Sequence, residues 1–397
     1  MENDSPILFI EIDKSEIIFV VSKKDDSENY EILLKDRITN QNTINFSYAD
    51  YNLTHDLLEK KIYLIEQKLN FTFKEVIISL QDIDLSILNV SGFKNLNGAQ
   101  LTRENITYIL NSLKTQINEL EKKTVLHIFN TKYLLDNKKT ENLPLGLFGN
   151  FYSQEHSFIL IKNNDYKNLK NIFEKCNLKI NRIISKSFLG GIDLISKNEN
   201  CETFFKFEIG KKFIQLIYFE NSSLKFMQNF DFGIEIIIND ISKIEDLKKE
   251  IIDKILSDKN FFSEDVNDAL ISEKYFENQN FRKIQKKLLI DISYARIDEI
   301  FEIILFKNFN VLSLLKKDIN VFLNFEDSIK INFFQKILME YFLKKNELNF
   351  IITKKPSTED LAIKAVQLVQ FGRKKEALPI VNEKKTIISR IFGLFFK

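Results

Sequence analysis

Two stretches of this chain, about 200 residues apart, show the same order of predicted elements, and this recurrence limits the possible folds more than any other feature. Residues 7 to 22 read as two β-runs broken at residues 13 to 15, and a third strand follows them. Residues 203 to 230 repeat this order as a strand, a tight turn at Gly210 and two further strands. The repeat predicts an internally duplicated fold with a cleft between its halves.

A helix and a strand follow the first copy of the repeat. Residues 55 to 70 place their apolar side chains on one helical stripe, and residues 73 to 80 return to strand character. A hairpin followed by a helix and a strand is typical of an α/β or α+β unit. Residues 82 to 162 then read as a compact insert, with a helix after Gly98 and strands further along.

The part of the chain after the second copy is richer in helical patterns. Residues 239 to 307 are predicted to be mostly helical, residues 319 to 325 to form a strand, and residues 331 to 345 to form a helix. Ser357 follows a proline and precedes Asp360 by three residues. This spacing predicts a capping box at the start of one more helix.

Composition excludes several classes of protein. The 57 basic and 56 acidic residues nearly cancel and are interleaved, which argues against a nucleic-acid partner. Cys176 and Cys201 are the only cysteines and form no CxxC pattern, so we expect a reducing compartment and no zinc site. His127 and His156 are expected to be ordinary strand or loop residues. We therefore assign no metal ligands and no catalytic residues.

The sequence also predicts where the protein resides. No apolar run approaches the roughly 18 residues that span a bilayer. The N-terminus lacks the basic region and the cleavage site of a signal peptide. We therefore expect the chain to be made and kept in the cytoplasm.

The C-terminus is predicted to be a tethered amphipathic helix. Residues 372 to 383 read as a charged linker, and residues 384 to 397 place large apolar side chains on one helical face and cations on the other. Such a helix either packs onto its own protein or lies on anionic lipid, and the cationic charge and the linker favour lipid. The residues assigned to the membrane are Lys384, Lys385, Ile387, Ile388, Arg390, Ile391, Phe392, Phe395, Phe396 and Lys397.

Three segments, taken in order, resemble the FtsA family of bacterial cell-division proteins, which belongs to the actin-like ATPase superfamily. They are PLGLFGN at residues 144 to 150, FDFGIEIIINDISK at residues 230 to 243 and ISYARIDEIFEII at residues 292 to 304. Arg296 and Glu299 in the last segment are expected to form an intrahelical ion pair. The resemblance implies an α/β, actin-like (ribonuclease H-like, duplicated) two-domain fold with an inserted α+β subdomain and a C-terminal amphipathic helix.

The resemblance also implies a division of the chain into subdomains. The first actin-like subdomain would comprise residues 1–81, 163–199 and 345–371, and the inserted subdomain residues 82–162. The second actin-like subdomain would comprise residues 200–243 and 312–344, and residues 244–311 would form a helical subdomain that faces FtsZ.

Members of this superfamily bind ATP with Mg²⁺ between two strand-turn-strand loops, and the resemblance assigns those loops here. The residues assigned to the cofactor are Glu11, Asp13, Lys14, Ser15, Glu208, Gly210, Lys211, Lys212 and Asn324. The first loop lacks the glycine and the lysine of the family pattern, and its additional carboxylates should repel a triphosphate. The second loop keeps one glycine, and Lys211 or Lys212 would partly offset the lost amides by charge. The alternatives are a weakened ATP site and a pseudo-ATPase whose loops survive as turns, and the motif residues favour the second.

The resemblance implies a cell-division adaptor. Such a protein polymerises with itself, binds the C-terminal tail of FtsZ, attaches to anionic lipid on the inner face of the cell inner membrane at the division site, and recruits later division proteins through residues 82 to 162. One alternative is a PilM-like pilus assembly protein that binds a partner peptide. The other is an ATP-dependent enzyme of the same superfamily, which the missing glycines disfavour.

Overall fold

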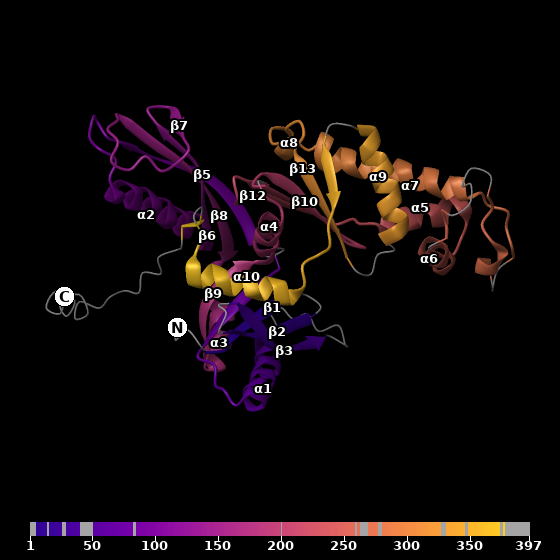
Figure 1. Ribbon diagram of the computed structural model, residues 1–397, viewed down its shortest axis with the longest axis horizontal. Coiled ribbons are helices and arrows are strands. Elements are labelled where there is room, and N and C mark those ends of the chain that lie inside the picture. The colour runs from indigo at the N-terminus through magenta and orange to yellow at the C-terminus, as the bar shows by residue number, and fades with distance from the viewer. Residues whose placement is uncertain are drawn as a thin grey trace. The chain divides into compact units, whose positions relative to one another are not determined.

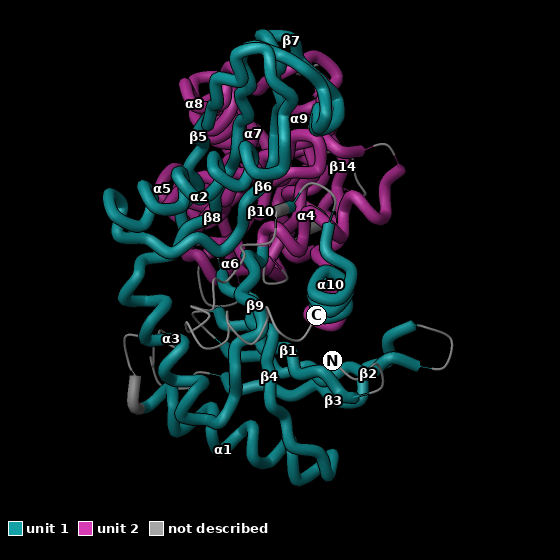
Figure 2. Tube along the Cα trace, turned by 90° about the vertical axis from the view of Figure 1, so that its left-hand side faces the viewer, with its two compact units in different colours: residues 1–186, 362–397 teal, residues 187–361 magenta. Residues whose placement is uncertain are grey.

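The computed structural model divides into two compact units, residues 1–186 with 362–397 and residues 187–361 (Figures 1 and 2). Each unit contains its own central five-stranded sheet. The residues that the structure describes are 5–13, 16–25, 29–39, 51–81, 85–199, 201–258, 260–262, 269–276, 280–326, 331–345, 348–373 and 376–377.

The central sheet of the first unit has the strand order β3-β2-β1-β4-β9. Its strands are β1 (Ile7–Ile12), β2 (Glu16–Lys24), β3 (Tyr30–Thr39), β4 (Glu75–Leu80) and β9 (Lys179–Ser185). β1 is buried at all of its positions, which explains its nearly continuous apolar sequence. Helices α1 (Tyr51–Leu69) and α3 (Asn163–Lys175) contact each other, and α3 contacts β9. The hairpin, third strand, helix and return strand predicted for this region are confirmed.

The central sheet of the second unit has the order β12-β11-β10-β13-β14. Its strands are β10 (Phe204–Ile209), β11 (Ile214–Glu220), β12 (Ser223–Phe230), β13 (Asn320–Phe325) and β14 (Asn349–Ile352). In both sheets the first strand pairs antiparallel with the second and parallel with the fourth. Glu11 of β1 lies opposite Ser79, and Glu208 of β10 lies opposite Asn324 at the same distance from the strand end. The predicted duplication is therefore confirmed.

The insert folds as a further sheet in the first unit, with the order β15-β6-β8-β5. Its elements are β5 (Leu85–Asn95), α2 (Arg103–Leu120), β6 (Lys123–Leu135), β7 (Lys138–Thr140) and β8 (Phe151–Lys162). α2 begins at a capping box between Thr102 and Asn105, and its Ile109 packs into the same core as Phe158. Residues 152 to 156, which are mostly polar, belong to β8. Gln154 and His156 are buried there, so the polar sequence of this segment does not indicate a loop.

The second unit adds helices around its sheet, as predicted. These are α4 (Lys186–Lys197), α5 (Glu235–Glu245), α6 (Lys249–Ser257), a 3-10 turn (Glu273–Phe276), α7 (Lys286–Phe301), a π-helical turn (Glu302–Phe306), α8 (Phe309–Leu312) and α9 (Ile331–Lys345). Two boundaries differ from the sequence assignment. Residues 187 to 197 of α4 belong to the second unit, where Gly191 leaves room for the ring of Phe219. Residues 349 to 352 belong to the second sheet, because β14 pairs with β13.

From Ala362 onward the described chain belongs to the first unit. α10 (Thr358–Phe371) begins at the predicted capping box, in which Ser357 and Asp360 bond each other's backbone N–H, and it ends at Gly372 with φ +65°. β15 (Glu376–Ala377) then pairs antiparallel with β6 of the insert. The predicted linker is therefore not a free tether at these two residues. Residues 384 to 397 lie outside the described residues, so the predicted membrane helix is not tested. Among the helices that the structure describes, none is both long and apolar enough to cross a membrane.

Candidate functional site: two equivalent loops

Each central sheet carries a tight turn at the end of its first strand. In the first sheet the N–H of Asp13 donates to the carbonyl of Glu16 at 3.0 Å. In the second sheet the N–H of Gly210 donates to the carbonyl of Phe213 at 2.8 Å. These two turns are the loops that the sequence assigned to a nucleotide. They belong to different units, and Lys14 and Ser15 at the tip of the first lie outside the described residues.

The carboxylates of the first loop are held by a lysine that sequence reasoning missed. The ammonium of Lys186, at the start of α4, lies 2.6 Å from Glu11 Oε1 and 3.3 Å from Asp13 Oδ2. Glu11 is 3% exposed, and its other oxygen, Oε2, has no hydrogen-bond partner among the described residues. The lysine therefore supplies the positive charge beside Glu11, the carboxylate expected to position hydrated magnesium.

The second loop has one of its backbone donors occupied by a carboxylate. The N–H of Lys211 donates to Glu326 Oε2 at 3.0 Å, and Glu326 is held in turn because its own N–H donates to Ile209. Loop amides of this kind bind phosphate in nucleotide-binding proteins. Here the amide already has an anionic partner, and that anion would repel a phosphate group. The side chains of Lys211 and Lys212 are exposed.

The backbone behind the second loop is closely packed. A Cβ on Gly233 would lie 2.3 Å from the carbonyl oxygen of Gly210, so only glycine fits at this position without a shift of the loop. The N–H groups of Ile234 and Glu235, at the start of α5, donate to the carbonyls of Gly210 and Lys211. The start of α5 therefore fixes the loop from behind.

A second lysine neutralises the equivalent carboxylate of the second sheet. Lys206 Nζ lies 2.7 Å from Glu208 Oε1, two positions along the same strand. Lys206 is 1% exposed, whereas the Glu208 side chain is 19% exposed. Both equivalent carboxylates are thus paired with lysines of their own unit.

Asn324 is the remaining residue assigned to the nucleotide. It lies within β13, the strand predicted for residues 319 to 325, and is 2% exposed. Its Nδ2 donates to both the carbonyl and the hydroxyl oxygen of Thr353 at 2.9 Å. The side chain therefore joins β13 to the segment after β14.

Taken one at a time, the loops do not fit ATP with Mg²⁺. A magnesium ion at Glu11 would have to compete with the Lys186 ammonium for a buried carboxylate. A phosphate at the second loop would meet the Glu326 carboxylate on the amide of Lys211. Neither loop by itself therefore offers a free carboxylate and free amides for a bound nucleotide.

Two of the three segments that carried the family resemblance meet in the second unit. Arg296 of α7 lies 2.5 Å from Asp240 of α5 and 2.5 Å from Glu299. The hydrogen bond to Asp240 is the main cause that raises the pKa of Arg296. The predicted pair with Glu299 is confirmed. The contact with Asp240 joins α7 to α5, and the sequence did not predict this contact.

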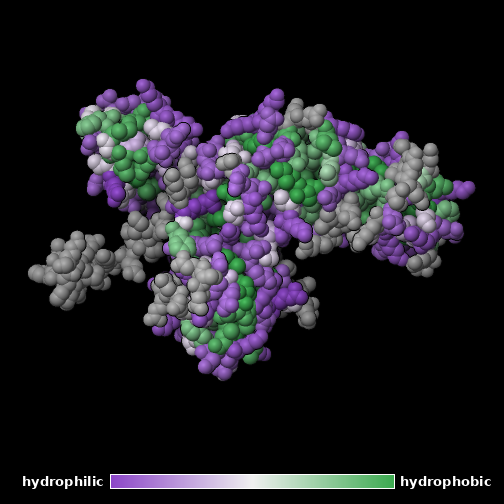
Figure 3. All heavy atoms as spheres, viewed as in Figure 1, coloured by the Kyte–Doolittle hydropathy of each residue, from purple (hydrophilic) through white to green (hydrophobic). Residues whose placement is uncertain are grey.

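The third segment lies on the surface of the insert. Gly146 has φ +80°, and the N–H of Gly146 and the carbonyl of Leu147 both bond to the backbone of Leu101. Leu147 and Phe148 are 53% and 70% exposed. Figure 3 shows hydrophobic residues on the visible surface of this subdomain.

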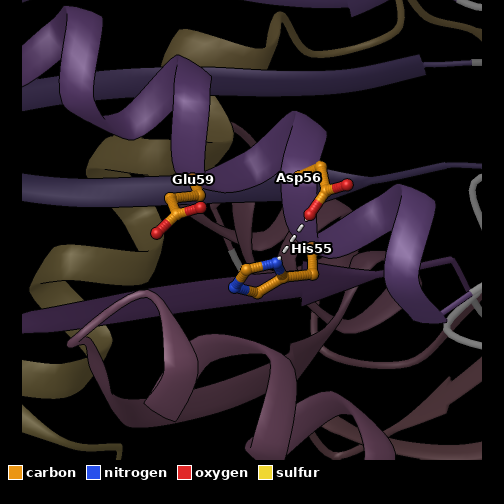
Figure 4. A group of neighbouring side chains, drawn as sticks. All are labelled: His55, Asp56 and Glu59. Atoms are coloured by element: carbon orange, nitrogen blue, oxygen red, sulfur yellow. Dashed lines mark hydrogen bonds and ion pairs between the residues drawn. The ribbon is translucent and has the colours of Figure 1, made fainter.

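One group of potential metal ligands occurs among the described residues, on α1 (Figure 4). His55 Nδ1 lies 3.0 Å from Asp56 Oδ1, and Glu59 lies one helical turn further on. Asp56 and Glu59 are exposed. Exposed acidic groups commonly occur without a metal, and we assign none here.

The comparisons with known proteins fit this geometry. No protein-family model matches the chain. The cell division protein FtsA of Buchnera aphidicola from Schizaphis graminum is 23% identical over 185 residues, which is 47% of this chain and 44% of the relative. FtsA of Buchnera aphidicola from Acyrthosiphon pisum is 21% identical over 234 residues, or 58% and 55% of the two chains. FtsA of Escherichia coli K12 is 19% identical over 167 residues, which is 42% of this chain and 40% of that relative. The chain is thus similar to FtsA proteins over about half of its length.

The alignments span about half the length of these FtsA relatives. Among solved structures, a PilM-PilN type IV pilus biogenesis complex matches with a TM-score of 0.51 at 8% identity, over 92% of this chain and 96% of that one. At that identity the likeness shows the fold alone. Together with the duplicated sheets, it confirms the actin-like fold expected of an FtsA relative.

Proposed function

We propose that this protein is a cell-division adaptor of the FtsA kind. It assembles with itself, holds FtsZ by its C-terminal tail through the helices of residues 244 to 311, and attaches to the inner face of the cell membrane. Residues 82 to 162 contact later division proteins. The observation that carries the proposal is the match to curated FtsA proteins on an actin-like fold.

The adaptor works without ATP turnover. What supports this is the charge arrangement of the two loops, where Lys186 holds Glu11 and Glu326 holds an amide of the second loop. Binding of ATP with magnesium should therefore raise the melting temperature little or not at all. Magnesium-dependent stabilisation with micromolar affinity would contradict this part of the proposal.

The membrane is bound through residues 384 to 397. A single amphipathic helix of this length binds reversibly, and assembly presents many helices at once, so weak contacts add up to stable attachment. Co-sedimentation of the full chain with liposomes that contain anionic lipid tests this. Deletion of the last 14 residues should abolish sedimentation with the liposomes, and unchanged binding would overturn this assignment.

A second candidate is a pilus-assembly role, which the likeness to the PilM-PilN complex favours. In that role the protein would capture the peptide of a membrane-protein partner and would not require its own lipid-binding helix. The location of a fluorescent fusion separates the two. A ring at midcell supports the adaptor, whereas absence from midcell together with tight capture of a partner's tail supports the pilus role.

A further inference from the structure

The chain contains a buried polar cluster that neither the loops nor the family resemblance explains. It joins three elements of the first unit: β6 of the insert, β9 of the central sheet, and β15 from the C-terminal segment. Glu376 of β15 is fully buried and lies 2.5 Å from His127 Nδ1 on β6, and it also pairs with Arg182 of β9. His127 Nε2 lies 3.2 Å from the N–H of Ser185.

The hydrogen bonds show which ring nitrogen of His127 faces each partner. Because the Ser185 N–H donates to Nε2, that nitrogen is an acceptor, and Nδ1 carries the proton that is donated to Glu376. Arg182 supplies a positive charge beside the same carboxylate. Burial by itself raises the pKa of Glu376, but His127 and Arg182 outweigh it and the pKa is lowered. Glu376 is therefore ionised at neutral pH.

Burial of these charged groups costs free energy, although the strand that they hold has only two residues. Glu376 Oε2 and two nitrogens of Arg182 are buried without hydrogen-bond partners among the described residues. Apolar side chains of similar volume would hold the strand at least as well, so a buried ion pair is weak evidence for stability alone. What it provides is specificity, because only a carboxylate at this position of the chain satisfies both His127 and Arg182.

We propose that His127 and Arg182 form a carboxylate-binding pocket that anchors the C-terminal tail to the insert sheet through Glu376. The last described residue, Ala377, is then paired with Ile128 of β6. From there to the start of the amphipathic segment at residue 384, six residues span at most about 20 Å, against about 40 Å for the twelve residues of an unanchored linker. The anchor thus keeps the insert close to whatever the tail binds. That last consequence rests on the proposed membrane attachment, whereas the anchor itself does not.

Hydrogen exchange of the full-length protein tests the anchor without membranes or partners. The variant Glu376→Gln keeps the shape of the side chain and removes its charge. We expect the backbone amides of residues 376 to 377 and of the facing edge of β6 to exchange at least about tenfold faster, with the central sheets unchanged. The matched control is Glu174→Gln, which removes a carboxylate from an exposed pair with Lys170. Equal exchange in Glu376→Gln and wild type, or equal acceleration in the control, overturns the proposal.

A disulfide separates loss of the anchor from general misfolding. Ile128 and Ala377 are direct cross-strand partners, which is a spacing that a disulfide can bridge. In the variant Glu376→Gln with Ile128→Cys and Ala377→Cys, oxidation should restore slow exchange at β15, and reduction should abolish it. If exchange remains fast after oxidation, strand docking is not what Glu376 controls. Deletion of the last 14 residues should leave exchange at residues 376 to 377 slow, so failure of the membrane proposal and failure of the anchor are distinguishable.

Discussion

The two central sheets share strand order and register, yet they neutralise the same carboxylate in different ways. In the first sheet, Glu11 is buried and its partner Lys186 comes from a helix far along the chain. In the second sheet, Glu208 is partly exposed and its partner Lys206 lies two positions away on the same strand. The duplicated backbone has been retained, whereas the source of the compensating charge has diverged. The carboxylate of the first sheet therefore depends on a lysine from another element, and the carboxylate of the second sheet depends on a lysine of its own strand.

Removal of the two lysines is the strongest way to test this difference. Lys186→Met leaves the buried carboxylate of Glu11 unpaired, and we expect a loss of about 3–5 kcal/mol in the free energy of unfolding. Lys206→Met should have a smaller effect, since the Glu208 side chain is 19% exposed and water takes over part of the lost interaction. Urea unfolding of both variants measures the two losses.

A double variant provides the control for the first lysine. Lys186→Met combined with Glu11→Gln removes both charges, so it should recover part of the stability that Lys186→Met loses. Equal losses in Lys186→Met and Lys206→Met would show that the two sheets do not differ in the way described.

The same contrast separates what the sequence could predict from what it could not. The turn at Gly210 and the capping box of Ser357 with Asp360 depend on residues a few positions apart, and both were predicted. The pairs of Lys186 with Glu11 and of Lys211 with Glu326 depend on residues brought together only by the fold. No local pattern marks such partners among the 57 basic and 56 acidic residues of the chain.

The strand at residues 376 to 377 was not predicted, for a related reason. Glu376 follows three basic residues and precedes a proline by three positions, which is the composition of a solvated linker. Its two partners lie on strands of two different sheets, and His127 carries no motif. The sequence pattern therefore does not indicate that one carboxylate of a polar segment is buried. The repeat of strand order, by contrast, is carried by many residues and was recognised from pattern alone.

The units also differ in histidine content, and this predicts a difference in acid sensitivity. All three histidines lie in the first unit. Burial of His156 in β8 lowers its pKa from the ordinary value of 6.5 to about 4. Between these values the unfolded chain binds a proton that the folded insert does not bind, so stability falls as the pH falls through this window. The expected loss is on the order of 3 kcal/mol.

Comparison with a variant isolates this contribution. His156→Leu removes the titrating group and both of its ring nitrogens, which have no hydrogen-bond partner among the described residues. Unfolding in urea at pH 7 and at pH 5 should show a smaller pH dependence for the variant than for wild type. Identical dependence would mean that His156 is not the group that titrates in this window.

The smallest expected effect concerns the backbone behind the second loop. Gly233→Ala places a methyl group 2.3 Å from the carbonyl oxygen of Gly210, and backbone atoms yield less readily than side chains. The loop must shift, and we expect a loss of about 1–3 kcal/mol. Gly190→Ala is the comparison, because its methyl group would meet a side-chain atom, the Nζ of Lys206, and no backbone atom. If the loss at position 233 is no larger than at position 190, the start of α5 does not fix the loop. The second loop would then be held by the Glu326 carboxylate and by its own strands.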